Sequence, residues 1–283
     1  MELSERVKSF FDTYPEAYDL LDDSELVKLY ELYTKMYEGN YYAKLQELNK
    51  VIYDPEIACG LDKLPHEVLK NLPGRFFMDV DTPSKVVITQ NMEDCGSELF
   101  YKCTAVEEIE ITSNQDRIPS RMFFNCVNLK SVNLRRPYTL IAGSAFSGCR
   151  ALESFEFPDS LEVISSYSFF ETGLKNITIP ECSVRDFAFA KSALESVTCG
   201  ANVLFDYAFG QCASLTSFTI TNPDVILRRN PFDGCMNLHE ITFEGTKAQW
   251  IAAQGALKLG NGTGIERVIC TKERKNQVVP IKK

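Results

Sequence analysis

The stretch AFSGCRALESFEFP, which runs from Ala145 to Pro158, decides the fold because its pattern returns along the chain. A phenylalanine followed three residues later by a cysteine occurs four more times, and two weaker copies lie between them. The key phenylalanines of the seven copies are Phe100, Phe123, Phe146, Phe169, Phe189, Phe209 and Phe232. Successive copies are 23 or 20 residues apart. A fixed period of this length predicts an array of repeated structural units.

Each copy continues with a leucine-like residue, two polar positions and a triplet in which two apolar residues flank one other residue. The apolar pairs are Ile109 and Ile111, Val132 and Leu134, Phe155 and Phe157, Ile177 and Ile179, Val197 and Cys199, Phe218 and Ile220, and Ile241 and Phe243. This alternation predicts a short strand with one buried face. One strand per unit cannot bury that face alone, so the units are expected to stack in parallel into a solenoid.

These residues give the chain a specific resemblance. The pattern Ala-Phe-x-x-Cys-x-x-Leu-x-x-Ile-x-Ile-Pro resembles the BspA-like class of leucine-rich repeats, and Leu174 to Pro180 repeats its second half. An apolar residue also stands five positions before each key phenylalanine from the second copy onward: Ile118, Ile141, Ile164, Val184, Leu204 and Leu227. The resemblance covers about 86–271. It implies a parallel-strand solenoid used for protein binding or adhesion, often in surface or secreted proteins of bacteria and some protists.

The fourth and fifth copies are trimmed, and the fifth carries Cys199 where the pattern has a branched residue. Each departure is expected to bend or tighten the solenoid locally.

Three regions follow. Residues 1–85 are expected to be a helical capping or effector domain, because Ser4 and Ser24 can cap helices whose apolar residues recur at helical spacing. This region is also acidic, with net charge −7 from 10 Lys/Arg and 17 Asp/Glu. Residues 86–245 form the predicted solenoid, and 246–283 a C-terminal cap with a basic tail. The predicted class is therefore α+β: a solenoid of about seven rungs after a small helical domain.

Cysteines and histidines give little sign of a chemical site. Five of the ten cysteines occupy one repeat position, where Thr172 and Ser192 replace them in the trimmed units, so the position is expected to select a small buried side chain. No Cys-x-x-Cys pair occurs, and His66 and His239 are the only histidines. We therefore predict reduced thiols, no metal, no cofactor and no catalytic residues.

Composition narrows the partner class. The net charge of −9 argues against direct binding of nucleic acid. No apolar run approaches the length of about 18 residues that a membrane span needs. The N-terminal residues lack the basic and apolar regions of a secretory signal. The chain is thus expected to be a cytoplasmic monomer that binds another protein, with a cell-surface location as the alternative.

The candidate binding residues are those that alternate with the buried ones and line up from rung to rung on the exposed sheet face. They are Glu108, Glu110, Asn133, Arg135, Glu156, Thr178, Thr198, Thr219 and Thr242. Solenoids commonly bind partners through such continuous faces. The competing interpretation is that exposed strand positions simply favour threonine and serine.

Three hypotheses remain open. The first is a non-enzymatic, intracellular protein-binding module that uses the sheet face. The second is a bacterial surface adhesin, or a segment of one. The third is a small bacterial or viral inhibitor of a host nucleic-acid enzyme, in which the acidic residues 1–85 imitate nucleic acid.

Overall fold

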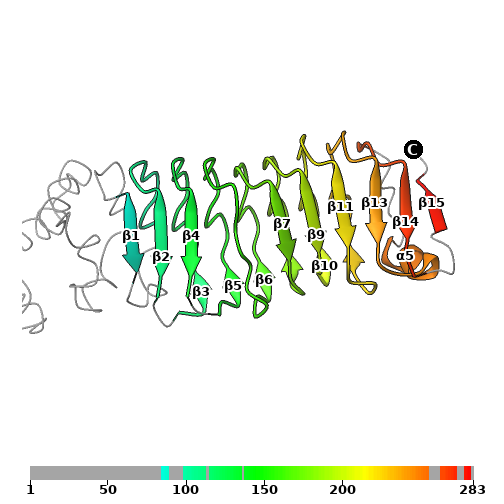
Figure 1. Ribbon diagram of the computed structural model, residues 1–283, viewed down its shortest axis with the longest axis horizontal. Coiled ribbons are helices and arrows are strands. Elements are labelled where there is room, and N and C mark those ends of the chain that lie inside the picture. Colours follow the sequence, from blue (N-terminus) through cyan, green and yellow to red (C-terminus); the bar gives the residue numbers. More distant parts are fainter. Residues whose placement is uncertain are drawn as a thin grey trace, which may run out of the picture.

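A computed structural model describes residues 84–88, 98–112, 115–135, 137–254, 262–272 and 277–281 (Figure 1). Within these ranges the chain coils into a rod whose strands follow one another along the long axis. The predicted parallel-strand solenoid is therefore confirmed. The predicted helical domain at 1–85 lies almost wholly outside the described residues. Units 1 to 7 are named below by their key phenylalanines, from Phe100 to Phe232.

The longer strands form the front sheet, which consists of two pieces. The first piece is three parallel strands: β1 (Lys85–Ile88), β2 (Glu108–Ile111) and β4 (Ser131–Leu134). The second piece has six: β7 (Asn176–Ile179), β9 (Ser196–Cys199), β11 (Ser217–Ile220), β13 (Glu240–Phe243), β14 (Arg267–Cys270) and β15 (Gln277–Pro280). Neighbours pair in parallel at the repeat period, as Ile109 does with Val132, and among the described strands only β15 is antiparallel to its neighbour.

A second sheet, the back sheet, is built from strands of two residues. These are β3 (Arg117–Ile118), β5 (Leu140–Ile141), β6 (Val163–Ile164), β8 (Ser183–Val184), β10 (Val203–Leu204) and β12 (Ile226–Leu227). The second residue of each is the apolar residue noted before each key phenylalanine, and all six are buried. The apolar character of these positions was noted in the sequence, but their place in parallel strands was not predicted.

The core between the two sheets is a column of phenylalanine rings. All seven key phenylalanines are fully buried. Adjacent rings stack along the rod with centroids 5.2 to 6.0 Å apart, as between Phe169 and Phe189 or between Phe209 and Phe232. Because each ring contacts the units before and after it, burial depends on neighbouring units and not on distant ones.

The corner around each key phenylalanine also continues the hydrogen-bonded ladder. The amide of Phe146, for example, donates to the carbonyl oxygen of Ser168 in the next unit at 2.8 Å. In units 1 to 6, the residues two before and two after the key phenylalanine adopt left-handed backbone, such as Arg121 (φ 53°) and Asn125 (φ 57°) in unit 2. In unit 3 the second of these positions is Gly148, where a Cβ would lie 1.9 Å from Asn125 Oδ1. Glycine therefore lets unit 3 pack closely on unit 2.

The front sheet is interrupted at unit 3, where a strand over Phe155 and Phe157 was predicted and is absent. In the described part of the chain, no backbone hydrogen bond joins residues 154–157 to β4 or β7. Two large rings point inward here, and Phe157 reaches past its neighbour to Phe189, 6.0 Å away between centroids. Other units place smaller residues at one or both of these positions. The prediction failed because it used polarity alone and ignored side-chain size.

The shortened unit 4 begins directly after this interruption. The turn between its key phenylalanine, Phe169, and Leu174 has one residue fewer than the corresponding turn of unit 3. Within this turn, Gly173 lies so close to unit 3 that a Cβ would approach the carbonyl oxygen of Arg150 to 2.2 Å. A side chain larger than hydrogen at this position would therefore clash with unit 3, while local bending or tightening of the solenoid stays a prediction.

The C-terminal end of the rod is covered by a helix and by the antiparallel strand β15. In helix α5 (Lys247–Gln254), Trp250 is fully buried and meets the ring of Phe243 edge-on at 5.3 Å. Strand β14 continues the parallel ladder past 245. The proposed domain boundaries stay predictions. Within the described ranges, no helix is both long and apolar enough to cross a membrane.

Candidate partner-binding face

The outer face of the front sheet gathers the predicted binding residues into two groups. In the first piece, Val87, Glu110 and Asn133 form one row across β1, β2 and β4, while Lys85, Glu108 and Ser131 form the row beside it. In the second piece, the structure brings four threonines into one row, which we call the threonine strip: Thr178, Thr198, Thr219 and Thr242. Glu156 is exposed within the interruption between the two pieces.

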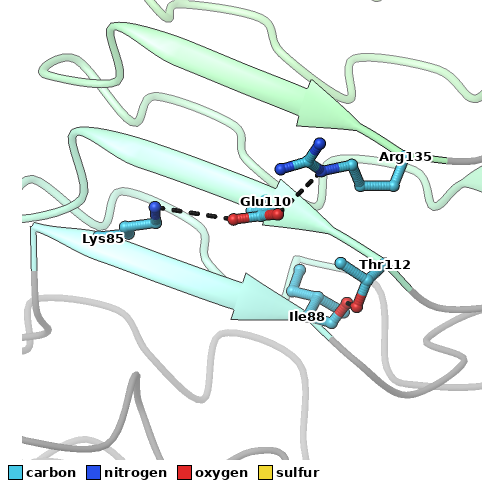
Figure 2. Close-up of polar contacts among 5 residues, drawn as sticks. All are labelled: Lys85, Ile88, Glu110, Thr112 and Arg135. Atoms are coloured by element: carbon cyan, nitrogen blue, oxygen red, sulfur yellow. Dashed lines mark hydrogen bonds and ion pairs between the residues drawn. The ribbon is translucent and has the colours of Figure 1, made fainter.

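Glu110 is held between two cations (Figure 2). Arg135 Nε donates to one carboxylate oxygen at 2.9 Å, and Lys85 Nζ lies 3.6 Å from the other. The hydrogen bond from Arg135 lowers the pKa of the Glu110 carboxyl, so the group stays ionised. The negative charge of Glu110 is neutralised by these two cations of the protein itself. The acidic end of the face is therefore less negative than the sequence suggested, and Arg135 serves Glu110 as a partner.

The threonine strip has a different character. Thr178 and Thr198 are exposed, whereas Thr219 and Thr242 are half-buried. In the row beside it, Ser196 Oγ donates to Asn176 Oδ1 at 2.6 Å. Further along that row, Glu240 pairs with Arg267. The strip itself consists of four neutral side chains, each with a methyl group and a hydroxyl, on consecutive hydrogen-bonded strands.

The eight described cysteines are all buried, and none of them is in a disulfide bond. At the shared repeat position the thiol donates to the preceding unit's carbonyl, as Cys149 Sγ does to Phe123 O at 3.2 Å. Thr172, which replaces cysteine in unit 4, donates to Phe169 O at 3.0 Å. The position therefore selects a small hydrogen-bond donor, whereas the sequence analysis recognised only the small size. Burial raises the pKa of the Cys182 and Cys199 thiols to about 12.

Metal and acid–base chemistry find little support among the described residues. No group of three His, Cys, Asp or Glu side chains there is placed to hold a metal ion. His239 is exposed, and its Nδ1 lies 3.3 Å from the carbonyl oxygen of Gly264.

A row of surface aromatic residues was not predicted from the sequence. Tyr167, Phe187 and Tyr207 stack at the position two residues before the key phenylalanine in units 4, 5 and 6. Aligning the copies would have shown three aromatics at one repeat position.

Comparisons with known proteins agree with the repeat architecture. The family model described as BspA type leucine rich repeat region matches residues 70–195 and 139–252, with 6 copies. No curated protein is similar enough to match.

Three solved structures are similar to the chain. A leucine-rich repeat protein from Bacteroides ovatus is 20% identical, with 55% of this chain and 58% of that chain covered and a TM-score of 0.29. The pneumococcal vaccine antigen PcpA is 17% identical, with 69% and 58% covered and a TM-score of 0.47. A leucine rich cell surface protein from Faecalibacterium prausnitzii is 17% identical, with 64% and 84% covered and a TM-score of 0.28. The chain thus spans 58% of the length of the first two.

Proposed function

Because the chain belongs to the BspA-type leucine-rich repeat family, we propose that it is a non-enzymatic module that binds another protein through the outer face of the front sheet. Within the front sheet, the threonine strip is the proposed centre of contact. Glu108, Glu110, Asn133, Arg135 and Glu156 would flank it at the N-terminal end. The proposed site of action is the cytoplasm, and the proposed form is a monomer.

The observation that carries this proposal is the register of Thr178, Thr198, Thr219 and Thr242 on four consecutive hydrogen-bonded strands. β-Branched side chains have few rotamers, so little side-chain entropy is lost when a partner covers them. Neutral hydroxyls also cost less to desolvate than charged groups do. A partner can therefore cover the strip without burying an unpaired charge.

The N-terminal, acidic end of the front sheet is a less suitable centre of contact, because its carboxylate Glu110 is already paired. Glu110 already has Arg135 and Lys85 as partners. A partner that competed for this carboxylate would have to replace two interactions that the protein makes on its own. Exposed ion pairs contribute little stability, about 0–1 kcal/mol, but they reduce the net charge that a partner meets.

A photo-cross-linking amino acid at Thr198 tests the proposal. The matched control places the same amino acid at Val203, a half-buried position in back-sheet strand β10. We expect one protein from source-cell extract to cross-link at Thr198 and not at Val203. Equal cross-linking at both positions, or at Val203 alone, would contradict binding through the front sheet. Capture only from material outside the cell would favour the adhesin alternative.

A further inference from the structure

Three aromatic residues form a ladder on a corner of the rod, on a side of the molecule distinct from the threonine strip. Tyr167, Phe187 and Tyr207 stack with ring centroids 5.0 Å apart and interplanar angles of 7° and 16°. All three have left-handed backbone, with φ of 60°, 56° and 56°. Bulky residues are poorly suited to this conformation. The same position holds Glu98, Arg121 and Ser144 in units 1 to 3, so the fold does not require aromatic residues there. Residues held in such conformations cluster at functional sites.

A second row of positions lies directly after each key phenylalanine, and in unit 4 its residue packs against this ladder. In units 1 and 2, Tyr101 and Phe124 stack at 5.0 Å. In unit 4, Phe170 contacts Tyr167 edge-on at 5.6 Å. Units 5 and 6 carry only Ala190 and Gly210 at this position. Phe187 and Tyr207 therefore lack the ring that Tyr167 has beside it.

The missing rings leave a hollow of about 270 Å³, which we call the aromatic groove. Its lining includes Tyr167, Phe170, Phe187, Lys191, Tyr207 and Gln211. Lys191 and Gln211 also line a second, wider hollow of about 500 Å³ over the shortened turns of units 4 and 5. The two hollows are therefore neighbours that share one wall. Tyr167 is 40% exposed, so ring surface is open to solvent at one end of the groove.

The charges at the shared wall favour an anionic partner. Arg150 Nη2 lies 3.0 Å and Lys191 Nζ lies 3.9 Å from oxygens of the same carboxylate, that of Glu171. Two cations thus share one anion, and Lys191 also lies over the ring of Phe170 at 5.3 Å from its centroid. This local excess of positive charge stands in a chain whose net charge is −9. A carboxylate entering the wider hollow would meet Lys191 and Arg150.

We propose that the aromatic groove docks an extended, acidic segment of a partner protein that carries aromatic side chains. A partner ring takes the place against Phe187 and Tyr207 that Phe170 takes against Tyr167, and a neighbouring carboxylate pairs with Lys191 and Arg150. Buried aromatic anchors of this kind commonly dominate protein interfaces. This groove is a second binding site, independent of the threonine strip.

Amide chemical shifts in the full chain, titrated with the peptide acetyl-Glu-Phe-Glu-Phe-Glu-amide, test the proposal. We expect saturable shifts at Ala190, Lys191, Gly210 and Gln211 with a dissociation constant of about 1 mM or below. Replacing phenylalanine by alanine, or glutamate by lysine, in the peptide should weaken binding at least about tenfold. Equal binding of the alanine peptide would show an anion site only and would overturn the proposal, as would no saturable shift with the parent peptide.

Two variants locate the peptide. Ala190→Phe places a ring in the groove as Phe170 does in unit 4, and Lys191→Glu reverses an exposed charge without altering the core. Both should lose the peptide shifts, and the dispersed spectrum of each reports that the fold is intact. Thr198→Arg on the threonine strip is the control and should bind the peptide as the parent protein does. Retained binding by Lys191→Glu, or lost binding by Thr198→Arg alone, would overturn the proposal.

Discussion

At the scale of single residues, the repeat position three residues after each key phenylalanine shows how a buried site can be defined by both size and chemistry. Cys126, Cys149 and Cys212 donate through sulfur to the preceding unit, and Cys235 does the same. Thr172 and Ser192 donate through oxygen within their own unit. Most of these carbonyl oxygens already accept a backbone amide, as Phe123 O does from Cys126 N at 3.2 Å, so the side chain at this position adds a second hydrogen bond to the same oxygen.

The buried thiols make stability depend on pH in the alkaline range. Burial raises the pKa of Cys199 from 9.0 to about 12. Between these values the unfolded chain releases a proton that the folded chain keeps, so the free energy of unfolding falls as pH rises. The contribution is complete below about pH 9 and is lost at up to about 1.4 kcal/mol per pH unit. Cys199→Ala should therefore show a shallower alkaline decline in urea unfolding, and an unchanged slope would contradict this.

Phe146 is the residue whose truncation should be most costly in the middle of the rod. It is fully buried and stacks on Phe123 and Phe169 at 5.4 and 5.3 Å. Phe146→Ala should lower the free energy of unfolding by about 3–5 kcal/mol, measured in urea. Thr178→Ala on the exposed face is the control and should change it by about 0.5 kcal/mol or less. A cost of about 1 kcal/mol for Phe146→Ala would mean that this ring is not the core contact described.

At the scale of elements, the front-sheet strands form where apolar and polar residues alternate, except at unit 3, where the apolar side chains are too large. Ile109 and Ile111 in β2 or Ile177 and Ile179 in β7 fit between neighbouring rungs. Phe155 and Phe157 do not fit together in this way, and the ladder stops at unit 3. Val132 and Leu134 of the adjacent strand β4 are consequently half-buried, whereas inner residues of the other parallel front-sheet strands are buried.

Smaller residues at unit 3 should restore the ladder. In Phe155→Ile/Phe157→Ile, we expect amide hydrogen exchange at residues 155–157 to become slower, because the backbone can then bond to β4 and β7. Phe218→Ile is the matched control, since Phe218 already lies in an intact strand, β11, and its replacement should not slow exchange there. The interpretation would be wrong if parent amides 155–157 were already as protected as those of β7.

At the scale of the whole molecule, the repeat made the architecture predictable from the sequence. Seven copies of one pattern mark the buried positions, including Ile118 and its equivalents in the back sheet. The interruption was not predicted, because the polarity of Phe155 and Phe157 does not show whether two rings of this size fit on one rung. Ion pairing of Glu110 was missed for a different reason. Lys85 and Arg135 stand 25 residues before and after it in the sequence, so their proximity appears only once the rungs are stacked. The helical cap proposed for 1–85 remains a prediction.

The dissociation constant of the purified partner for two matched double variants tests the central claim most directly. Thr178→Arg/Thr219→Arg places two charges two rungs apart on the threonine strip. Ser183→Arg/Ile226→Arg places two charges two rungs apart on the back sheet. Both should keep the parent melting temperature, because these side chains point away from the core. We expect the front-sheet variant to weaken binding at least about 100-fold, or about 2.7 kcal/mol, and the back-sheet variant to bind as the parent does. Unchanged affinity of the front-sheet variant would contradict the account.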